Sequence, residues 1–549
     1  KQIKPEGMKF ILLIILILWL VKITKDVLFW NYLWQLKEYR LDRMRAHFEL
    51  PSAKRIFVNK LYLTRVALLA SSSLLAIHIW QTAFTYLVLL FYALTALWAF
   101  YGAASKKIRK PVFTKKTIII SACSLFVLLS SAIIFYAILP SHIFIASLLA
   151  MDIISPLVVS FIVLILKFPS EILKNRVIEK AASKRKLLKN VLVVGVTGSY
   201  GKTSMKECLA HILSQKLKVL STPKNQNSEM GVANTILTEL TDAYDVFIAE
   251  MGAYRIGEIK RICYMAKPQI GILTGINEQH VSLFGSIENT MKAKYELIES
   301  LPRHGLAIFN GENEYTNALY EGTKIPKRIY ALRSFSVSKK PDISCEKITC
   351  TPEGTSFYLK IGDTRELFST PLLGRHNVLN ILGASLAAHN LGMSIDEIKE
   401  AVKTLKAPPR TLEQKPGINN STLIDDSYSG NPTGVYAALE VLEQMRGNKK
   451  ILVMYPLIEL GKSAIQVHRQ IALKINKACE LCILTSNDFA REIAKNAPNT
   501  DIIVMSDPQR IIAKLQKTVK EGDVVLIENR VPEEIINFLA AEIIPPTTV

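Results

Sequence analysis

The sequence predicts an α-helical membrane bundle followed by two α/β domains. Apolar stretches long enough to cross a bilayer recur before residue 170, and 49% of the 549 residues are hydrophobic. After residue 190, short apolar strands alternate with amphipathic helical segments, which is typical of a parallel sheet covered by helices. The first of these strands runs into the glycine-rich segment TGSYGKTS at 197–204.

Five apolar segments are expected to span the membrane. They lie at residues 8–24, 64–80, 82–104, 117–139 and 142–167. The segments rich in Lys and Arg lie at 37–60, 105–116 and 172–190. Basic loops stay on the cytoplasmic side, so the N-terminus is expected outside and everything after residue 168 inside. The interpretation is a multi-pass protein of the cell membrane, in contact with membrane lipids, whose α/β domains are cytoplasmic.

Two features of the apolar region have alternative interpretations. The first segment can be a signal peptide, but no small-residue cleavage site follows it, and Trp30 and Trp34 are typical of a membrane interface. We therefore favour an uncleaved anchor, with Met8 as the natural start. Asp152 lies inside the later segments, and it either marks a functional site or packs against a neighbouring helix.

The charge distribution argues against nucleic-acid binding. The formal net charge is +21, but residues 1–190 hold 27 Lys and Arg against 8 Asp and Glu, and residues 191–549 hold 41 against 39. A nucleic-acid-binding protein carries its basic excess on the folded domain, whereas here the excess flanks apolar segments. CELC at 479–482 is interpreted as part of a buried strand rather than a metal site. No nucleic-acid partner is expected.

The chain is expected to divide into four parts. A transmembrane region of about five helices covers 1–170, a basic cytoplasmic linker covers 171–190, and α/β domains cover 191–406 and 407–549. The last boundary falls within LKAPPRTLE at 405–413, whose paired prolines suit a short stiff linker.

The segment after the strand at 191–196 has the residue order of a nucleotide-binding loop. Backbone N–H groups and the helix N-terminus can surround phosphate oxygens, Lys202 adds positive charge, and the Thr203 hydroxyl can ligate Mg²⁺. Gly195 lies one position too early for the strict G-x-x-x-x-G-K-T pattern, so a glycine-rich turn with a chance Lys is the alternative. The expected ATP contacts are Gly198, Ser199, Tyr200, Gly201, Lys202, Thr203 and Ser204.

Nine ordered motifs between residues 190 and 535 resemble the Mur ligases, and the MurF type most closely. The motifs are VTGSYGKTS, TPKNQNSEMGVANTIL, AEMGA, NEQHVSLFGS, KAKYELIESLPRHGLAIFN, GRHNVLNILGA, APPR, DDSYSGNPTGVYAAL and IELGKSAIQVH. DDSYSGNP at 425–432 nearly matches the DDSYNANP that is usual in MurF enzymes. The resemblance implies a central P-loop ATPase-like domain and a C-terminal Rossmann-like domain.

The resemblance also implies an activity. In this family a substrate carboxylate attacks the γ-phosphate of ATP, and an incoming amine converts the resulting acyl phosphate to an amide. MurF enzymes join D-alanyl-D-alanine to UDP-N-acetylmuramoyl-tripeptide. The expected function is a membrane-anchored amide ligase of peptidoglycan precursor synthesis that uses ATP and Mg²⁺. Its expected partners are a muropeptide-like carboxylate and an amino acid or dipeptide.

The same resemblance implies roles for residues around the phosphates. Lys202 would hold the β- and γ-phosphates. Thr203 and Glu250 would hold one Mg²⁺. His280 and Lys294 would hold a second, because the family's lysine is characteristically carbamylated and then offers a carboxylate-like oxygen. Without the resemblance, Lys294 is a surface lysine and Glu250 a carboxylate at the end of a strand.

Other residues are implied in nucleotide and substrate binding. Asn377 in GRHN resembles the family's adenine contact. Arg410 and Asp426 resemble nucleotide contacts that come from the linker and the third domain when the enzyme closes. Asn225 and Asn227 are the implied substrate contacts.

Departures from the family pattern leave the substrate open. Apolar segments stand where MurF enzymes have a small domain for the uridine nucleotide, so a lipid-linked carrier is an alternative. Where the family usually has KGSR, this chain has IENR at 527–530. Where the family usually has LGDM, it has MYPL at 454–457. Two other functions remain: the same chemistry on a cell-surface or poly-amino-acid substrate, and a non-catalytic membrane scaffold with a nucleotide-binding domain. Retention of the expected metal ligands argues against the scaffold.

Overall fold

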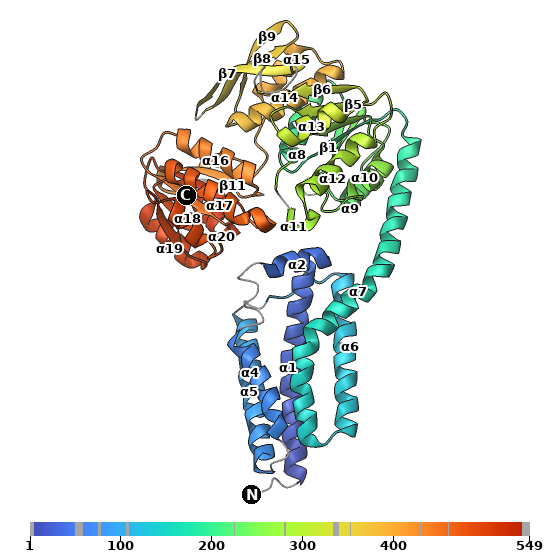
Figure 1. Ribbon diagram of the computed structural model, residues 1–549, viewed down its shortest axis with the longest axis vertical. Helices are drawn as coiled ribbons and strands as arrows, with labels where there is room; N and C mark the ends of the chain where they lie inside the picture. The colour runs from blue at the N-terminus through green and yellow to red at the C-terminus, as the bar shows by residue number, and fades with distance from the viewer. Residues whose placement is uncertain are drawn as a thin grey trace, which may run out of the picture. The chain divides into compact units, whose positions relative to one another are not determined.

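The computed structural model consists of two compact units, Lys1–Leu173 and Lys174–Val549. It describes residues 5–49, 59–74, 78–105, 109–223, 226–278, 281–332, 340–351, 353–428, 430–458 and 460–540. The first unit is built of helices, and the second contains the β-strands (Figure 1).

The helical unit buries large apolar and aromatic side chains between long helices. Its described elements are α1 (Pro5–Leu36), α2 (Leu41–Glu49), α4 (Lys60–Ser71), the 3₁₀ turn η1 (Ser72–Leu74), α5 (His78–Ala104), α6 (Lys115–Ile138) and the first part of α7 (Ser141–Leu187). Trp19, Tyr92 and Phe144 from three of these helices are buried in one core. Thr114 and Thr117 exchange hydrogen bonds in a capping box that starts α6.

Three of the described helices are long and apolar enough to cross a membrane. They are Trp80–Ala104, Lys115–Ile138 and Ser141–Leu187. They contain most of the expected spans at 82–104, 117–139 and 142–167. The expected span at 8–24 lies in α1, which is not one of the three.

The expected span at 64–80 is wrong as a single helix. Helix α4 ends at Ser71 and continues only as a 3₁₀ turn to Leu74. Ser71, Ser72 and Ser73 each donate a hydroxyl hydrogen bond to the carbonyl three residues earlier. Such side-chain bonds compete with regular helix bonds. A hydropathy window averages over these small side chains and does not detect the break.

A buried polar cluster joins α1, α5 and α7. Asp152 is 1% exposed, and it accepts hydrogen bonds from Trp19 Nε1 at 3.0 Å and from the Tyr92 hydroxyl at 3.1 Å. Lys22 forms ion pairs with Asp152 and Asp26. A buried carboxylate is tolerated when it is paired and hydrogen-bonded. Asp152 therefore packs against neighbouring helices, which is one of the two interpretations of the sequence.

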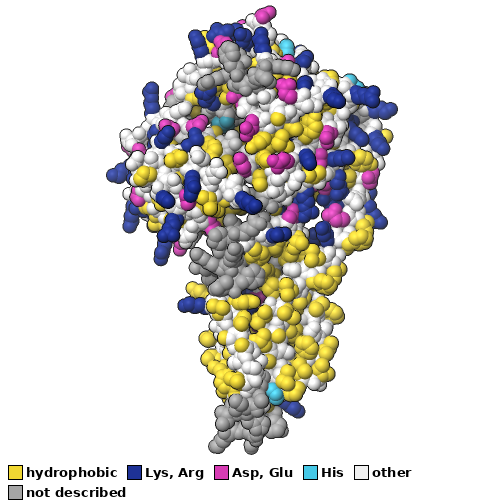
Figure 2. Space-filling model, in the orientation of Figure 1, with side chains coloured by type: hydrophobic (Ala, Val, Ile, Leu, Met, Phe, Trp, Pro, Cys, Tyr) yellow, Lys and Arg dark blue, Asp and Glu magenta, His cyan; other side chains and the backbone are white. Residues whose placement is uncertain are grey.

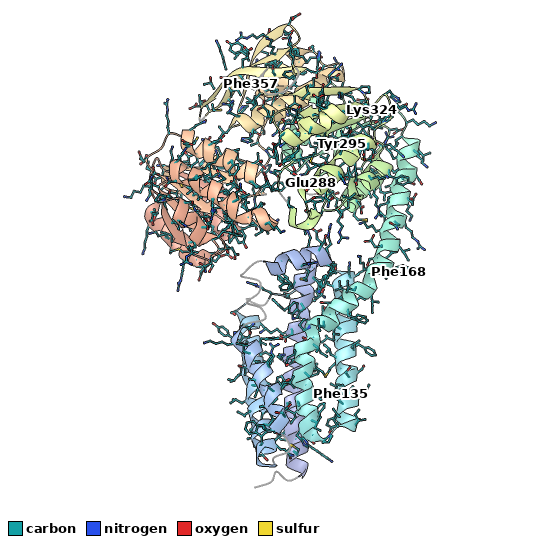
Figure 3. The ribbon with its side chains drawn as sticks, viewed as in Figure 1. Phe135, Phe168, Glu288, Tyr295, Lys324 and Phe357 are labelled. Carbon is teal, nitrogen blue, oxygen red and sulfur yellow. The ribbon has the colours of Figure 1, made fainter. Side chains whose placement is uncertain are left out.

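The outer surface of the helical unit is rich in hydrophobic side chains (Figure 2). Phe168, labelled in Figure 3, is 75% exposed, and Leu157 and Phe161 on the same helix are also exposed. A contiguous apolar surface of this kind is unfavourable in water and typical of proteins that contact lipid or a partner.

The segment expected as a basic linker at 171–190 is mostly helical. Residues 174–187 form the end of α7, where Ile178, Ala181 and Ala182 join the core of the second unit. Arg185 donates from Nε to the Ala266 carbonyl at 3.0 Å and from Nη2 to the Val191 carbonyl at 2.8 Å. The buried face recurs at intervals of three and four residues, as in an amphipathic helix.

The second unit begins with a nine-stranded sheet. Its strands are β1 (Leu192–Thr197), β2 (Val219–Ser221), β3 (Val246–Glu250), β4 (Ile270–Leu273), β5 (Leu306–Asn310), β6 (Lys327–Tyr330), β7 (Ile343–Thr351), β8 (Gly354–Ile361) and β9 (Thr364–Thr370). The order is β2-β3-β1-β4-β5-β6-β7-β8-β9. Strands β1 to β6 pair in parallel with their neighbours, and β8 pairs antiparallel with β7 and with β9. The predicted parallel α/β arrangement is confirmed.

Helices cover both faces of this sheet. They are α8 (Lys202–Leu213), α9 (Glu229–Thr238), α10 (Glu258–Ala266), α11 (Val281–Phe284), α12 (Ile287–Glu299), α13 (Glu314–Gly322), α14 (Arg375–Asn390) and α15 (Ile395–Lys403). Val194 and Val196 of β1 point to the core shared with α8 and α14, and Val193 points to the core shared with α9, α10 and α12. Alternation of side chains along a strand produces these two cores.

The C-terminal part of the second unit has its own six-stranded sheet. Its strands are β10 (Glu413–Pro416), β11 (Thr422–Asp426), β12 (Lys450–Met454), β13 (Leu481–Leu484), β14 (Asp501–Val504) and β15 (Val524–Glu528). The helical elements are η2 (Ile418–Asn420), α16 (Pro432–Gln444), η3 (Gly461–Ser463), α17 (Ala464–Ala478), α18 (Ala490–Asn496), α19 (Pro508–Thr518) and α20 (Glu533–Leu539). The order is β10-β11-β15-β12-β13-β14, with only β10 antiparallel to its neighbour. Cys482 is buried in β13, as the strand interpretation of CELC predicts.

Two acidic residues lie side by side at the carboxyl end of this sheet. Asp426 of β11 and Glu528 of β15 are register partners on neighbouring parallel strands. Both are buried, and burial raises the pKa of each carboxyl above its ordinary value. The neighbouring carboxyl raises the pKa of Glu528 further, because two adjacent negative charges repel.

Glu528→Gln should make the C-terminal sheet less sensitive to rising pH. A carboxyl whose pKa is raised in the folded state binds more protons than in the unfolded state, so its contribution to stability falls as pH rises above about 4. For one group the slope is at most about 1.4 kcal/mol per pH unit. The measurement is hydrogen exchange of β15 backbone amides between pH 5 and pH 8, corrected for the intrinsic exchange rate.

The exposed neighbour Glu521, substituted by Gln, is the control and should follow the wild type. Equal losses of protection with pH in the wild type and in Glu528→Gln would show that Glu528 does not titrate in this range.

Candidate active site

The predicted phosphate loop lies at the point where strand order reverses in the nine-stranded sheet. Strand β1 lies next to β4, and the chain leaves β1 for β2 on one side and leaves β4 for β5 on the other side. The loop 198–201 follows the carboxyl end of β1 and leads into α8. Crevices at such positions are the usual ligand sites of open α/β sheets.

Two glycines let the loop approach the end of β4. A Cβ atom on Gly198 would lie 2.1 Å from Thr274 Oγ1. Gly201 has a φ of 74°, a conformation that favours glycine, directly before the first turn of α8. The Ser199 backbone N–H donates to the Gly275 carbonyl at 2.6 Å. These contacts fix a glycine-rich loop at a helix N-terminus, where anions bind favourably.

Lys202 occupies the first position of α8, and its side chain folds back over the loop. Its Nζ donates to the Gly198 carbonyl at 2.8 Å and to the Ser199 carbonyl at 3.2 Å. Burial lowers the pKa of Lys202, and the negative charge of Glu250 opposes this shift. The ammonium group thus lies where phosphate oxygens would lie in a nucleotide-binding loop.

Glu250, at the end of β3, lies beside Thr203, the other predicted ligand of the first Mg²⁺. Thr203 donates its hydroxyl to the two carboxylate oxygens at 3.1 and 3.0 Å, and Asn227 Nδ2 donates to one of them at 2.9 Å. Lys206 Nζ lies 3.8 Å from the same carboxylate. Hydroxyl and carboxylate oxygens are the donors that Mg²⁺ prefers, and Mg²⁺ typically takes few protein ligands and completes its shell with phosphate and water. The described residues contain no group of three or more His, Cys, Asp or Glu placed to hold a metal.

Lys294 faces the same small cavity as Lys202. The cavity has a volume of about 50 Å³ and is lined by Ser199, Lys202, Asn227, Gly252, Ala253, Tyr254, Phe284 and Lys294. Lys294 is 3% exposed, so the surface-lysine interpretation is wrong. Burial, followed by the positive charge of Lys202, lowers the pKa of Lys294 to about 7. A substantial fraction of its amine is therefore neutral near neutral pH.

The other residues predicted around the nucleotide each have a different environment. The Tyr200 hydroxyl hydrogen-bonds Asn313, and Ser204 is buried in α8. Asn377 is buried in the first turn of α14, where its Nδ2 donates to the Leu373 carbonyl at 2.9 Å. The cavity is not lined by these side chains. His280 and Asn225 lie outside the described residues, and their roles stay predictions.

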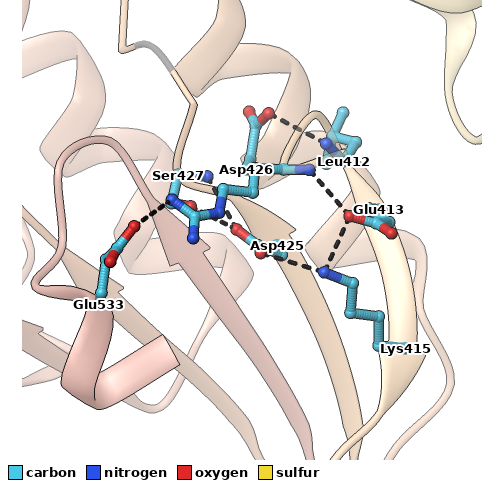
Figure 4. Close-up of polar contacts among 8 residues, drawn as sticks. Leu412, Glu413, Lys415, Asp425, Asp426, Ser427 and Glu533 are labelled. Atoms are coloured by element: carbon cyan, nitrogen blue, oxygen red, sulfur yellow. Dashed lines mark hydrogen bonds and ion pairs between the residues drawn. The ribbon is translucent and has the colours of Figure 1, made fainter. Parts of the chain in front are cut away.

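Arg410 and Asp426 lie together in the C-terminal sheet region rather than at the cavity. Arg410 Nη1 pairs with Glu533 at 3.0 Å, and the Asp426 carboxylate accepts from the Leu412 N–H at 3.0 Å (Figure 4). Both side chains are thus engaged within their own domain, and their nucleotide contacts stay predictions.

Two further residues next to the loop were not singled out from the sequence. Lys206 is fully buried one turn after Lys202, and its Nζ donates to the Thr222 carbonyl at 2.7 Å. Tyr428 of DDSYSGNP hydrogen-bonds the Thr203 side chain. The spacing of four between Lys202 and Lys206 was a usable signal, because such residues share one helix face.

Two protein families match the α/β part of the chain. Residues 196–388 match the Mur ligase middle domain, and residues 412–528 match the family described as Mur ligase, glutamate ligase domain. A MurF crystal structure from Acinetobacter baumannii is 25% identical with a TM-score of 0.58, and covers 66% of this chain and 80% of that one. MurF from Thermotoga maritima in complex with ADP shares the fold, with a TM-score of 0.57 at 24% identity, covering 66% of this chain and 83% of that one.

Curated relatives carry the name UDP-N-acetylmuramoyl-tripeptide--D-alanyl-D-alanine ligase. The Escherichia coli protein is 34% identical over 280 residues, which are 51% of this chain, and the chain spans 61% of that relative's length. The Synechocystis sp. protein is 30% identical over 343 residues, covering 61% of this chain and 71% of that relative. With both domains matched in order, the chain belongs to the Mur ligase family.

Proposed function

We propose that this protein is an ATP-dependent amide ligase of peptidoglycan precursor synthesis that adds D-alanyl-D-alanine to a UDP-N-acetylmuramoyl-tripeptide. One observation carries the proposal: Lys202, Glu250 and Lys294, from three elements of the Mur ligase middle domain, converge around the phosphate loop. The names of the relatives supply the substrate pair.

The loop would bind the triphosphate of ATP. Its backbone N–H groups and the start of α8 offer partial positive charge, and Lys202 adds a full charge. To reach the β- and γ-phosphates, the Lys202 ammonium exchanges its present acceptors, the carbonyls of Gly198 and Ser199, for phosphate oxygens. The reaction is then chiefly a matter of aligning and neutralising negative groups.

Thr203 and Glu250 would hold Mg²⁺, since their oxygens already lie within hydrogen-bond distance of each other. The ion supplies charge neutralisation on the phosphates. Asn227 orients the Glu250 carboxylate through its side-chain amide. His280 and a carbamylated Lys294 are the proposed ligands of a second Mg²⁺.

Lys294 is suited to carbamylation by its surroundings. Only a neutral amine attacks CO₂, and burial beside Lys202 favours the neutral form. The ammonium first loses one proton. The neutral amine then attacks CO₂, an N–C bond forms as a C=O π bond of CO₂ breaks, and a second proton leaves the nitrogen, so that a cation becomes an anion. That change removes the repulsion between the two buried lysines.

The C-terminal domain would complete the site when the enzyme closes. Arg410 would leave Glu533 for the nucleotide, Asp426 would contact the nucleotide from the end of β11, and Asn377 would contact adenine. Closure of this kind excludes water and commits the substrate.

The helical unit is proposed to anchor the ligase in the cell membrane with its α/β domains in the cytoplasm. Support comes from three helices of sufficient length and apolarity and from the exposed apolar surface of this unit. A lipid-linked muropeptide is the alternative carrier of the substrate carboxylate.

Detergent-solubilised full-length protein should release phosphate from ATP when UDP-N-acetylmuramoyl-tripeptide and D-alanyl-D-alanine are both present. Either substrate alone should give little release, because the acyl phosphate needs an amine acceptor. Parallel assays with a lipid-linked muropeptide identify the carrier. Absence of release with every carrier and the dipeptide would refute the proposed ligase activity.

Lys202→Ala should lower ATP turnover by at least about a hundredfold, because it removes the charge that holds the phosphates. The variant should remain in the membrane fraction, since no apolar helix is changed. The matched control is Lys216→Ala, an exposed lysine whose ion pair with Glu397 contributes little. Turnover of Lys202→Ala equal to that of the control would rule out the loop as the phosphate site.

Lys294→Ala should lose more than about tenfold in turnover while still binding a fluorescent ATP analogue, because the loop is intact. Acetate should partly restore turnover by offering a carboxylate at the vacated position. Lys292→Ala on the exposed face of α12 is the control, with normal rates and no response to acetate. Wild-type rates of Lys294→Ala without acetate would remove this residue from the site.

A further inference from the structure

The helical unit contains a cavity ten times larger than the one at the phosphate loop. Its volume is about 510 Å³. Four helices and two connecting segments line it with Lys25, Asp26, Phe29, Trp30, Asn59, Leu61, Tyr62, Arg65, Trp98, Tyr101, Gly102, Ser105, Arg109, Asp152, Ile153 and Pro156. All of these residues belong to the first unit, so the cavity is separate from the proposed ligase site.

Cations outnumber free carboxylates at this cavity. Lys25, Arg65 and Arg109 contribute positive charge, whereas Asp152 is already engaged by Lys22. Asp26 shares its carboxylate between Lys22 at 3.0 Å and Arg65 at 3.5 Å. In the described part of the chain, the buried Arg65 Nε has no hydrogen-bond partner. An anion in the cavity would offset this excess and accept from that N–H.

Aromatic side chains connect the cavity with the apolar outer surface. Lys25 Nζ lies 3.5 Å from the centroid of the Trp98 ring. Trp98 and Tyr101 line the cavity, yet they are 57% and 67% exposed. Leu94 and Leu97 on the same helix are also exposed. A ligand with a charged head and a long apolar chain fits this combination, with the head inside and the chain along α5.

We propose that this cavity binds a phosphorylated lipid. Its phosphate would accept hydrogen bonds from Arg65 and Arg109 and lie beside Lys25, while its chain would cover the exposed face of α5. Arginine and lysine in this arrangement favour phosphate over an uncharged head. The proposal does not depend on the ligase reaction, because no residue of the phosphate loop takes part.

The test is native mass spectrometry of the full-length protein in detergent with defined probes. Phosphatidylglycerol and undecaprenyl phosphate should both bind, because they share a lipid-linked phosphate. Diacylglycerol and pyrophosphate should bind at least about tenfold more weakly, since each lacks one half of the ligand. A preference between the two lipid probes identifies the source of the phosphate.

Two substitutions test the cations, each with a matched control. Arg109→Gln removes an exposed cavity cation, and Lys110→Gln removes the same charge one residue away, outside the lining. Lys25→Gln removes a cation stacked on an aromatic ring, and Lys116→Gln removes another, which lies 4.0 Å from the Tyr39 ring centroid. Each cavity variant should weaken lipid phosphate binding on the order of tenfold, and the controls should not.

Equal binding of diacylglycerol and phosphatidylglycerol would overturn the proposal, because the cavity would then recognise only apolar chains. Binding of pyrophosphate as tight as that of the lipids would overturn the lipid part. Equal losses of lipid binding in Arg109→Gln and Lys110→Gln would also overturn the proposal, because binding would then depend on net charge and not on a cation in the cavity. Arg109 is exposed and lies outside the helices, so its variant should fold even where Lys25→Gln does not.

Discussion

The buried carboxylate of Glu250 is the constraint that organises the phosphate loop. It is 4% exposed at the end of β3, and a buried carboxyl group needs hydrogen-bond partners. Thr203 and Asn227 provide hydrogen bonds, and Lys206 provides a nearby positive charge. Because these partners come from α8 and from the segment before α9, satisfying one carboxylate fixes the start of α8 against β3.

The two lysines at the small cavity need the opposite kind of partner, one that is negative or accepts hydrogen bonds. Lys202 and Lys294 line a space of about 50 Å³. Carbonyl acceptors stabilise the ammonium group of Lys202, and the lowered pKa of Lys294 favours its neutral form. In the proposed nucleotide complex, phosphate oxygens would replace the carbonyl acceptors of Lys202, and their negative charge would lie beside both lysines.

The strands of the α/β domains were predictable because each one is a short run of apolar residues followed by a turn. The strand expected at 191–196 is β1, and Glu250 lies at the end of a strand, β3, as expected. The convergence of Lys294 with Lys202 was not predictable from residue type. Lys294 lies on α12, far along the chain, and only its buried position on that helix brings it to the loop. The motif resemblance identified it, whereas the physical pattern indicated a surface lysine.

The helical unit was less predictable because hydropathy averages over single residues. The serines that end α4 are small, so the window from 64 to 80 remains apolar. The positive-inside argument treats each Lys and Arg as a marker of a loop. In the structure Lys22 pairs with the buried Asp152 and the partly buried Asp26, and Arg185 binds carbonyls where α7 joins the α/β domain.

Some of the Lys and Arg of the first 190 residues therefore have structural roles in two places. Lys22, Lys25 and Arg65 lie within the helical unit, where they meet Asp26, Asp152 or an aromatic ring. Arg185 serves the junction of α7 with the second unit. These cations have partners that account for their positions without reference to a membrane face. A membrane topology deduced from charge therefore depends on the other Lys and Arg residues, such as the exposed Arg109 and Lys110. Since Arg109 also lines the large cavity, a single basic segment can serve both orientation and ligand binding.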